Sequence, residues 1–497
     1  MRPGPAGLWC AGVLWAALAS GQNGPTPIDR LLQELAGSSP LEKNLHVLCD
    51  QIGGRLPGTP AMRRAVTWAV EAFREAGLTE VARESFTVPN SWTEGDSRAE
   101  VTGPARFAAR VAAVGWTPAT PNGGLEAEVL AAGAGEEGEI TRLGEAARGK
   151  ILLVRSDASA SFHDLAVAQR RATVALREAA QAGAVAVLLM STRPRGLLYR
   201  HVHSIDGRLD RLPAAVVARE DALRIQRLLE GGRRARMRLD LPNRTGGPFS
   251  AENVVAEIRG RESPEEVVIV GAHLDSWDLG TGCLDNGCNA ALVIEVARAL
   301  QATRPRPRRS VRFILFGAEE QGLLGSRAYV ERHRGELDRV AAVLIHDIGA
   351  GRVSGYSLGG RKDLEPALAE ALAPVASRGP GTHTSDALFG SDHFDFLLEG
   401  LPTLVANQDT TEYTPHYHAQ SDTLDKVDLT ELKNQTAIAA VLAYNLADRV
   451  ERPARRLSRA EMENMLKDTR LDDQLKFLGL WEEWARGERG RRKENAR

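Results

Sequence analysis

Residues 267–320 contain an ordered series of potential metal ligands at the ends of apolar segments. The stretch reads VVIVGAHLDSWDLG, then CLDNG, then FILFGAEEQG, and it supplies His273, Asp275, Asp285, Glu319 and Glu320. Two further candidates follow in LIHDIGAG and HYHAQSDT, namely Asp347 and His418. Carboxylates and imidazoles are the ligands of hydrolytic zinc centres. Five ligands with a spare carboxylate predict a pair of zinc ions and a general base beside them.

The order of these residues also predicts how the ligands divide between the two ions. Asp285 is the natural bridging ligand, because glycines in the loop 280–287 give the chain freedom to bring its carboxylate over the sheet edge. We expect His273 and Asp347 to complete the first metal site. We expect Glu320 and His418 to complete the second.

Asp275 and the Glu-Glu pair are the candidates for catalytic roles. Asp275 lies two residues after His273, so in an extended chain both point to the same side. Its carboxylate could then accept the second imidazole N–H and fix the tautomer. Glu319 and Glu320 are adjacent, so their side chains diverge. One can bind metal while the other faces a water molecule as general base.

The elements that must position these residues are buried strands. VVIVGAH, VRFILFGAEE and VAAVLIHD are continuous apolar runs, typical of parallel strands covered on both faces. NAALVIEVARAL separates the first two as a predicted crossover helix, and a helix containing GSRAYVERH separates the second and third. The pattern predicts an α/β fold with a doubly wound, mostly parallel sheet. Ligands of such sheets bind beyond the carboxyl ends of the strands, where these candidates lie.

The remaining chain divides into further segments. At 497 residues it is long enough for two domains. The Pro/Gly-rich sequence GWTPATPNGG (115–124) predicts a domain crossing. We therefore expect residues 23–115 and 246–450 to form the domain with the metal site, and residues 116–245, which again alternate strand and helix, to form an insertion. Residues 451–497 read as a charged helical tail whose end, ARGERGRRKENAR, is predicted to be disordered.

The first residues predict export. Arg2 precedes a short apolar run from Leu8 to Leu18 and a small-x-small cleavage sequence, so residues 1–19 read as a signal peptide. No segment reaches the roughly 18 uninterrupted apolar residues of a stable membrane span. A secreted or periplasmic protein is expected, or one of the lysosome or another secretory compartment in a eukaryote.

Charge and cysteine content exclude other classes of partner and site. The formal net charge of −2 gives no electrostatic reason to expect nucleic acid as a partner. Cys49, Cys283 and Cys288 remain after the predicted cleavage, and an odd number does not make a disulfide framework. Cys283 and Cys288 flank Asp285, but the C-x4-C spacing matches no usual zinc site. We expect them to pack as small residues under a tight loop.

HLDSWD, DNG, AEEQG, HD-x-G and H-x-x-x-D-T together resemble the co-catalytic zinc exopeptidases. IGGRLPGTP and NVVAEIRG also resemble that family, so the resemblance covers residues 45–450. It implies a zinc aminopeptidase-like fold with two zinc ions. It makes Glu319 the general base, Asp275 the active-site residue beside the first His ligand, and His418 rather than His416 a ligand. Residues 125–242 are similar to the protease-associated domain inserted into such enzymes, and SDHFDF (391–396) resembles a segment that lines the substrate pocket.

The implied activity is hydrolysis of short peptides or dipeptides, with a small peptide as the substrate. The motifs leave open whether a free amino or a free carboxyl terminus is read. Glutaminyl cyclisation and a non-catalytic receptor role are alternatives on related folds, but the complete ligand set disfavours both. Two roles for the inserted unit also stay open: covering the cleft and forming a homodimer.

Overall fold

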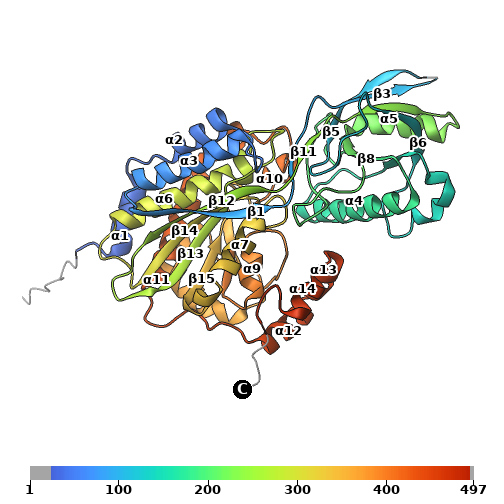
Figure 1. The fold of residues 1–497 in the computed structure, drawn as a ribbon. Helices are drawn as coiled ribbons and strands as arrows, with labels where there is room; N and C mark the ends of the chain where they lie inside the picture. Colours follow the sequence, from blue (N-terminus) through green and yellow to red (C-terminus); the bar gives the residue numbers. More distant parts are fainter. Residues whose placement is uncertain (1–23, 104, 493–497) are drawn as a thin grey trace, which may run out of the picture.

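The computed structural model describes residues 24–103 and 105–492, and in this part of the chain two sheets form separate cores (Figure 1). The predicted signal peptide lies outside the described residues. The first sheet has seven strands in the order β1-β12-β14-β13-β15-β17-β16. Its strands are β1 (Glu80–Val88), β12 (Phe249–Ile258), β13 (Ser263–His273), β14 (Arg309–Phe316), β15 (Val340–Ile345), β16 (Val353–Ser357) and β17 (Thr403–Gln408).

The four central strands of this sheet are parallel, whereas its edge strands are antiparallel. β14, β13, β15 and β17 pair in parallel, but β1, β12 and β16 run against their neighbours. The expectation of a mostly parallel sheet therefore holds only for its centre, and the fold is mixed α/β. For β12 the reason is the length of its connection to β13. Only residues 259–262 join β12 to β13, too few for the crossover that a parallel arrangement requires.

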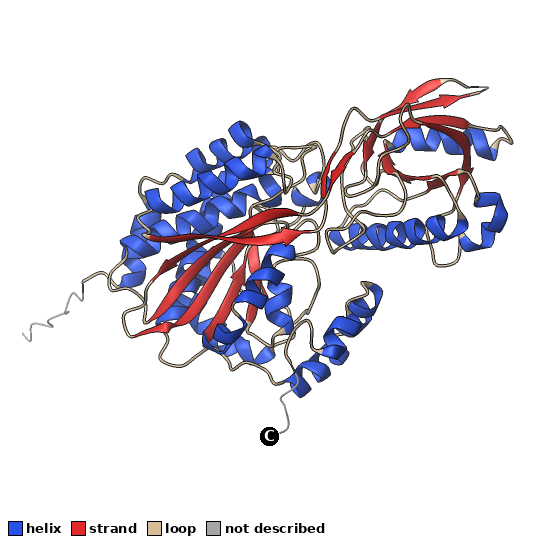
Figure 2. Ribbon diagram, in the orientation of Figure 1, coloured by secondary structure: helices blue, strands red, loops and turns tan. Residues whose placement is uncertain are grey.

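Helices cover both faces of the seven-stranded sheet, as the continuous apolar runs predict (Figure 2). Along β13, Val268 and Val270 face one hydrophobic core while Val267 and Ile269 face another. Since both sets are buried, this stretch of the strand is apolar at successive positions. The larger core is formed with α1 (Pro27–Ala36), α2 (Leu41–Leu45), α3 (Pro60–Glu75), α6 (Cys288–Ala302), α8 (Glu365–Leu372) and α11 (Leu429–Asp448). The smaller is formed with α7 (Leu324–Arg332) and α9 (His393–Leu398).

The second sheet has eight strands in the order β4-β3-β10-β6-β7-β8-β9-β5. Its members are β3 (Arg98–Thr102), β4 (Phe107–Ala109), β5 (Val111–Ala113), β6 (Leu125–Ala131), β7 (Ile151–Val154), β8 (Ala186–Met190), β9 (Ala214–Val217) and β10 (Arg236–Asp240), with α4 (Phe162–Ala182) and α5 (Arg219–Glu230). The sheet begins at Arg98, before the predicted crossing at 115–124, because β3 pairs with β10 and β5 with β9. The two-stranded ribbon of β2 (Ser91–Thr93) and β11 (Arg244–Gly246) pairs the two chain segments at the base of this unit.

The C-terminal segment folds onto the part of the protein built around the seven-stranded sheet, which is called the first part below. Its helices are α12 (Arg459–Asp468), α13 (Leu471–Phe477) and α14 (Trp481–Arg486). Arg489, which is 2% exposed, forms a two-pronged ion pair with Asp395 of α9 at 2.7 and 2.9 Å. The expectation of disorder is therefore wrong for residues 485–492, since a run of charges says nothing of a buried partner elsewhere in the chain. Residues 493–497 lie outside the described part.

Arg55 holds together the loop that follows β13. Its fully buried guanidinium donates to the carbonyl oxygens of Leu274, Thr281 and Gly282 at 2.7–2.9 Å and to that of Gly53 at 3.0 Å. The carbonyl of Gly282 also accepts the N–H of Gly287, but the other carbonyls depend on this arginine, and a buried polar group without a hydrogen bond costs roughly 1–3 kcal/mol. This arginine comes from the segment GGRLPGTP and shapes a loop more than 200 residues away in sequence.

Replacing Arg55 with methionine is expected to lower the free energy of unfolding by about 3 kcal/mol or more, because several buried carbonyl groups lose their donors together. Chemical denaturation measures the change. The matched control is Arg74→Met, which removes an exposed arginine of α3 and should change stability by less than about 0.5 kcal/mol. Equal denaturation midpoints for the two variants would show that Arg55 does not stabilise this loop.

Candidate metal centre

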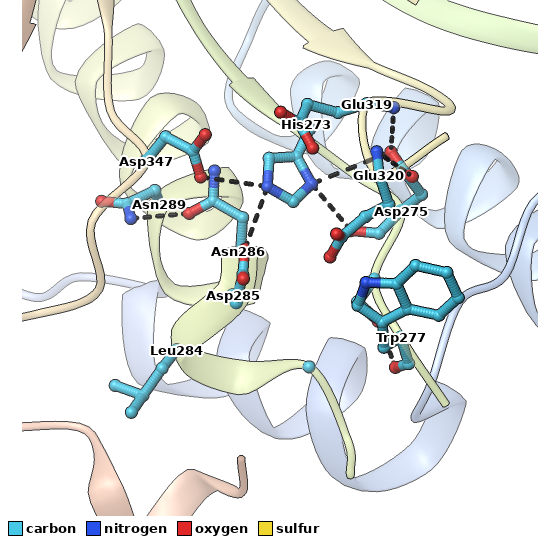
Figure 3. Close-up of polar contacts among 12 residues, drawn as sticks. His273, Asp275, Trp277, Leu284, Asp285, Asn286, Asn289, Glu319, Glu320 and Asp347 are labelled. Atoms are coloured by element: carbon cyan, nitrogen blue, oxygen red, sulfur yellow. Dashed lines mark hydrogen bonds and ion pairs between the residues drawn. The ribbon is translucent and has the colours of Figure 1, made fainter. Parts of the chain in front are cut away.

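His273, Asp285 and Asp347 converge at the carboxyl end of the central strands. His273 is the last residue of β13, and Asp347 follows β15 by two residues. The Nε2 atom of His273 lies 3.1 Å from Asp285 Oδ1 and 3.0 Å from Asp347 Oδ1 (Figure 3). These three residues are the set predicted for the first metal site, and all three are buried or nearly so.

Glu320 and His418 form a second group around the other oxygen of the same carboxylate. His418 Nε2 lies 3.1 Å from Asp285 Oδ2 and 3.0 Å from Glu320 Oε2. Asp285 thus contributes one oxygen to each group, in the position of a bridging ligand. His416, the other histidine of HYHAQSDT, instead contacts Ser421 Oγ through Nδ1 at 2.7 Å. The structure therefore brings together the residues predicted for the second site and leaves His416 outside it.

The donor set and its spacing fit a pair of zinc ions. In each group the ligand atoms lie within 4.8 Å of one another. Ligands bound at about 2.0–2.1 Å in a tetrahedral zinc site are roughly 3.3 Å apart, close to the distances found here. Glu320 Oε1 is buried and accepts no hydrogen bond. An orphaned carboxylate oxygen at this place is the expected sign of a cation site, since such groups are otherwise costly.

Burial and crowding shift the pKa values of these residues strongly. Burial raises the pKa of Glu320 to about 7, and the positive charge of His418 only partly opposes it. Burial alone would lower the pKa of His418, but the charge and hydrogen bond of Glu320 raise it to about 9. For Glu319 burial raises the pKa well above its usual range, and neighbouring carboxylates, including buried Asp392, add to the effect. Carboxylates this close need added positive charge to ionise together.

Asp285 is held in place by a carboxylate that sequence reasoning assigned no role. Asp422, four residues after His418, accepts the backbone N–H groups of Cys283 and Leu284 at 2.9 and 2.6 Å through Oδ1. Its Oδ2 accepts the N–H of Asp285 at 3.1 Å. The D-T of the H-x-x-x-D-T motif was the only sequence signal for this residue. Asp422 thus shapes the loop that presents the shared carboxylate.

Asp275 acts through contacts that differ from the expected ones. The ring Nδ1 of His273 lies 2.9 Å from the backbone carbonyl of Asp275, not against its carboxylate, which is 3.8 Å away. The carboxylate instead accepts the backbone N–H groups of Glu319 at 3.1 Å and Glu320 at 3.3 Å (Figure 3). The chain no longer runs as a strand after His273, so the alternation of side chains on which the prediction depended does not apply.

The Glu319–Glu320 pair sits on a tight turn after β14. Ala318 has a φ of 57°, a left-handed conformation that residues with a Cβ seldom adopt. His418 has a similar φ of 59°. Strained backbone of this kind costs of order 1–3 kcal/mol and persists where the surroundings hold it in place. Here the two turns place Glu320 and His418, the ligands of the second group, beside Asp285.

The second sheet contributes residues next to the centre that the sequence did not indicate. The loop after β8 reaches the first part of the protein, where the N–H of Arg200 donates to the carbonyl of His418 at 3.0 Å. The ring of His201 lies edge-on to that of His418, with centroids 4.9 Å apart. Conversely, Trp277 of HLDSWD, from the part of the chain that carries the metal centre, packs into the core of the second sheet beside Trp116.

The three cysteines of the described chain are buried free thiols, as expected from their count. Cys283 lies within the loop that carries Asp285 and Cys288 directly follows it, and neither belongs to the groups that could hold a metal ion. Burial raises the pKa of Cys288 well above its usual range. Neutral thiols are poor metal ligands, so small-residue packing accounts for both.

Comparisons with known proteins agree with this geometry. The sequence profile of peptidase family M28 matches residues 253–443. The chain is 30% identical to carboxypeptidase Q of Mus musculus over 416 residues, which covers 82% of this chain and 85% of the relative. It is 24% identical to aminopeptidase YwaD of Bacillus subtilis, with 82% and 84% covered. The crystal structure of a peptidase M28 precursor from Shewanella amazonensis superposes with a TM-score of 0.77 at 26% identity, covering 85% of this chain and 96% of that one. On this similarity in sequence and fold, the chain belongs to peptidase family M28.

Proposed function

We propose that this protein is a zinc-dependent exopeptidase that hydrolyses short peptides or dipeptides at the site around Asp285. The observation that carries the proposal is the shared position of Asp285, with one oxygen facing His273 and the other facing His418. Two ions held this way would have His273, Asp285, Asp347, Glu320 and His418 as their five ligands. Sharing one carboxylate is how two-metal hydrolytic centres keep their ions a few ångströms apart.

Glu319 is the proposed general base. When bound, the two zinc ions supply the activation of a water molecule and the polarisation of the scissile carbonyl group. Glu319 accepts a proton from that water and later donates it to the nitrogen of the leaving amine. Asp275 positions this base, because its carboxylate holds the N–H groups of Glu319 and Glu320.

The relatives named above include a carboxypeptidase and an aminopeptidase, so both terminal specificities agree with family membership. A glutaminyl cyclase, which uses one zinc ion, and a non-catalytic receptor are less well supported, since all five proposed ligands are present. We further propose that the eight-stranded unit corresponds to a protease-associated domain and that the protein acts in a secretory or periplasmic compartment. No helix of the described residues is long and apolar enough to cross a membrane. A homodimer stays a prediction.

Replacing Glu319 with glutamine is expected to lower kcat for a free dipeptide by roughly 10²–10⁴-fold, because the amide cannot accept the proton. Zinc content should stay at two ions per chain, since Glu319 is not a proposed ligand. Metal analysis and a dipeptide assay on the same preparation measure both quantities.

The control for this experiment is Glu365→Gln, which changes an exposed glutamate at the start of α8 and should leave kcat unchanged. Fewer than two zinc ions bound per wild-type chain would overturn the two-metal proposal. Full activity of the Glu319→Gln variant would overturn the assignment of the base.

Zinc is expected to stabilise the protein more as the pH rises from 6 to 9. The metal-free folded state gains stability from protonated His418 below pH 6.5 and loses it as the pH rises through about 9, the raised pKa of this imidazole. The raised pKa of Glu320, about 7, acts in the same direction. Zinc requires the deprotonated ligands, so its affinity grows over the same range.

Melting temperatures of zinc-loaded and chelator-treated protein at pH 6, 7, 8 and 9 test this expectation. The difference between the two should widen with pH in the wild type and in His416→Gln, whose imidazole contacts Ser421. In His418→Gln the difference in melting temperature should be smaller and should change much less with pH. A difference that is constant or narrows in the wild type would contradict the prediction.

A further inference from the structure

Arg193, in the loop after β8, is a buried cation without an acidic partner. Its side chain donates to the carbonyl of Tyr417 at 2.9 Å and to the hydroxyl of Thr192, while Nε has no hydrogen-bond partner. No carboxylate of the described residues forms an ion pair with it, although the residue is only 2% exposed. Burying a charge without a counter-ion is costly, so this position calls for an explanation.

The other buried arginines show how this chain normally satisfies a guanidinium. Seven arginines of the described residues are buried. Five of them pair with a carboxylate, namely Arg200, Arg309, Arg361, Arg459 and Arg489. Arg55 has no such pair but donates to four backbone carbonyls. Arg193 alone among the seven has neither solution: its guanidinium lies over the ring of Tyr199, 4.9 Å from the centroid, and its Nε keeps an unused N–H for a group that is not part of the chain.

This unused charge lies beside the proposed zinc ligands. The carbonyl that Arg193 contacts belongs to Tyr417, whose ring stacks on that of His418 with centroids 3.6 Å apart. Arg193, His201, Tyr417 and His418 line one cavity between the two parts of the protein, and none of the residues that line it is acidic. The carboxylates of the centre lie around Nε2 of His418, and the cationic group lies in the cavity that this histidine borders.

A second unpaired donor borders the same cavity. The N–H of Val202 donates to Nδ1 of His201 at 2.8 Å. In the neutral ring the proton must then sit on Nε2. This Nε2 is buried and has no hydrogen-bond partner. Nε of Arg193 and Nε2 of His201 are therefore two buried N–H donors that lack an acceptor, and both residues line one cavity.

We propose that Arg193 and His201 bind the free terminal carboxylate of a peptide substrate, so that the site reads the carboxyl end of the chain. The inference rests on the function proposed above and narrows it to short peptides with an unblocked carboxyl terminus. The carboxylate of the last residue lies within about 3.8 Å, one residue length, of the peptide bond that releases it. A carboxylate bound in the cavity that Arg193, His201 and the proposed ligand His418 line would therefore lie next to a scissile bond held over the metal centre.

The chemistry of the pair selects a carboxylate over neutral groups. A carboxylate accepts charge-assisted hydrogen bonds from a guanidinium and supplies the negative charge that buried Arg193 lacks. A carboxamide supplies no charge, and its NH₂ group would face further donors. A site with buried donors rejects an analogue that leaves them unpaired.

The test compares L-alanyl-L-alanine with L-alanyl-L-alaninamide, which differ only at the carboxyl terminus. The zinc-loaded wild type should cleave the free acid with a kcat/KM on the order of 100-fold higher than the amide. Arg193→Met should lose about that factor on the acid and little on the amide, so that the preference disappears. Arg193→Lys, which keeps the charge, should recover part of it. Thermal shifts with N-acetyl-L-alanine and its amide give a readout independent of turnover: the acid should stabilise the wild type but not Arg193→Met.

Arg195→Met is the matched control, because Arg195 lies two residues away with an exposed side chain and should retain the wild-type preference. A wild type that cleaves acid and amide equally, or an Arg193→Met variant that keeps the preference, would overturn this inference while leaving the exopeptidase intact. A wild type that cleaves neither substrate would instead count against the proposed function. If Arg193→Met does not fold, Arg193→Lys decides: an unchanged ratio of acid to amide would overturn the assignment.

Discussion

The sharing of Asp285 between two imidazoles is the contact on which the arrangement of the site depends. Each of its oxygens faces the Nε2 atom of a different histidine, one at the end of β13 and one on a distant loop. Glu320 and Asp347 then crowd into the same buried space. Like charges at such distances in a medium of low polarity repel strongly. The cluster is therefore an arrangement that added cations stabilise. Burial, with a smaller contribution from the charge of Asp285, raises the pKa of Glu320.

The rest of the first part serves to hold this cluster still. The parallel strands end at one edge, so His273, Glu319 and Asp347 start from a rigid frame. Two buried side chains then shape the loop of Asp285: Arg55 binds its carbonyl groups and Asp422 binds its N–H groups. A loop with so many polar backbone atoms could not otherwise be buried. The left-handed turns at Ala318 and His418 need the same close support.

The second sheet places a positive charge and unpaired hydrogen-bond donors beside the same site. Its loop meets the first part through the N–H of Arg200 and through ion pairs of that guanidinium with Glu94 and Asp278. This contact brings Arg193 to the wall of a cavity that His418 also lines. The centre thus has carboxylates on one side and unpaired donors on the other. A peptide with a free carboxyl end carries matching chemistry, since its carbonyl group suits the first side and its terminus the second.

The local sequence determined which residues could do chemistry and which strands present them. Ligand types, their order and the apolar runs before them are local properties, so His273, Asp285, Glu320, Asp347 and His418 could be named as candidates together with the helices between the strands. The resemblance to zinc exopeptidases then separated His418 from His416 and Glu320 from Glu319. The antiparallel edges of the sheet could not be predicted from the local sequence, because strand pairing depends on residues that are far apart along the chain. The ordered end of the tail could not be predicted either, because it depends on the ion pair of Arg489 with buried Asp395.

Only the tertiary structure decided the contacts that give these residues their roles. The carboxylate of Asp275 meets the N–H groups of Glu319 and Glu320 rather than the ring of His273, because the chain turns where a strand was extrapolated. Arg193 carries no sequence signal, and the motifs that contain Arg55 and Asp422 assign no role to either, since an arginine or an aspartate is usually a solvated surface residue. Their meaning comes from burial and from partners 100 or more residues away. Hydrogen bonding and desolvation act between neighbours in space, and the sequence lists only neighbours along the chain.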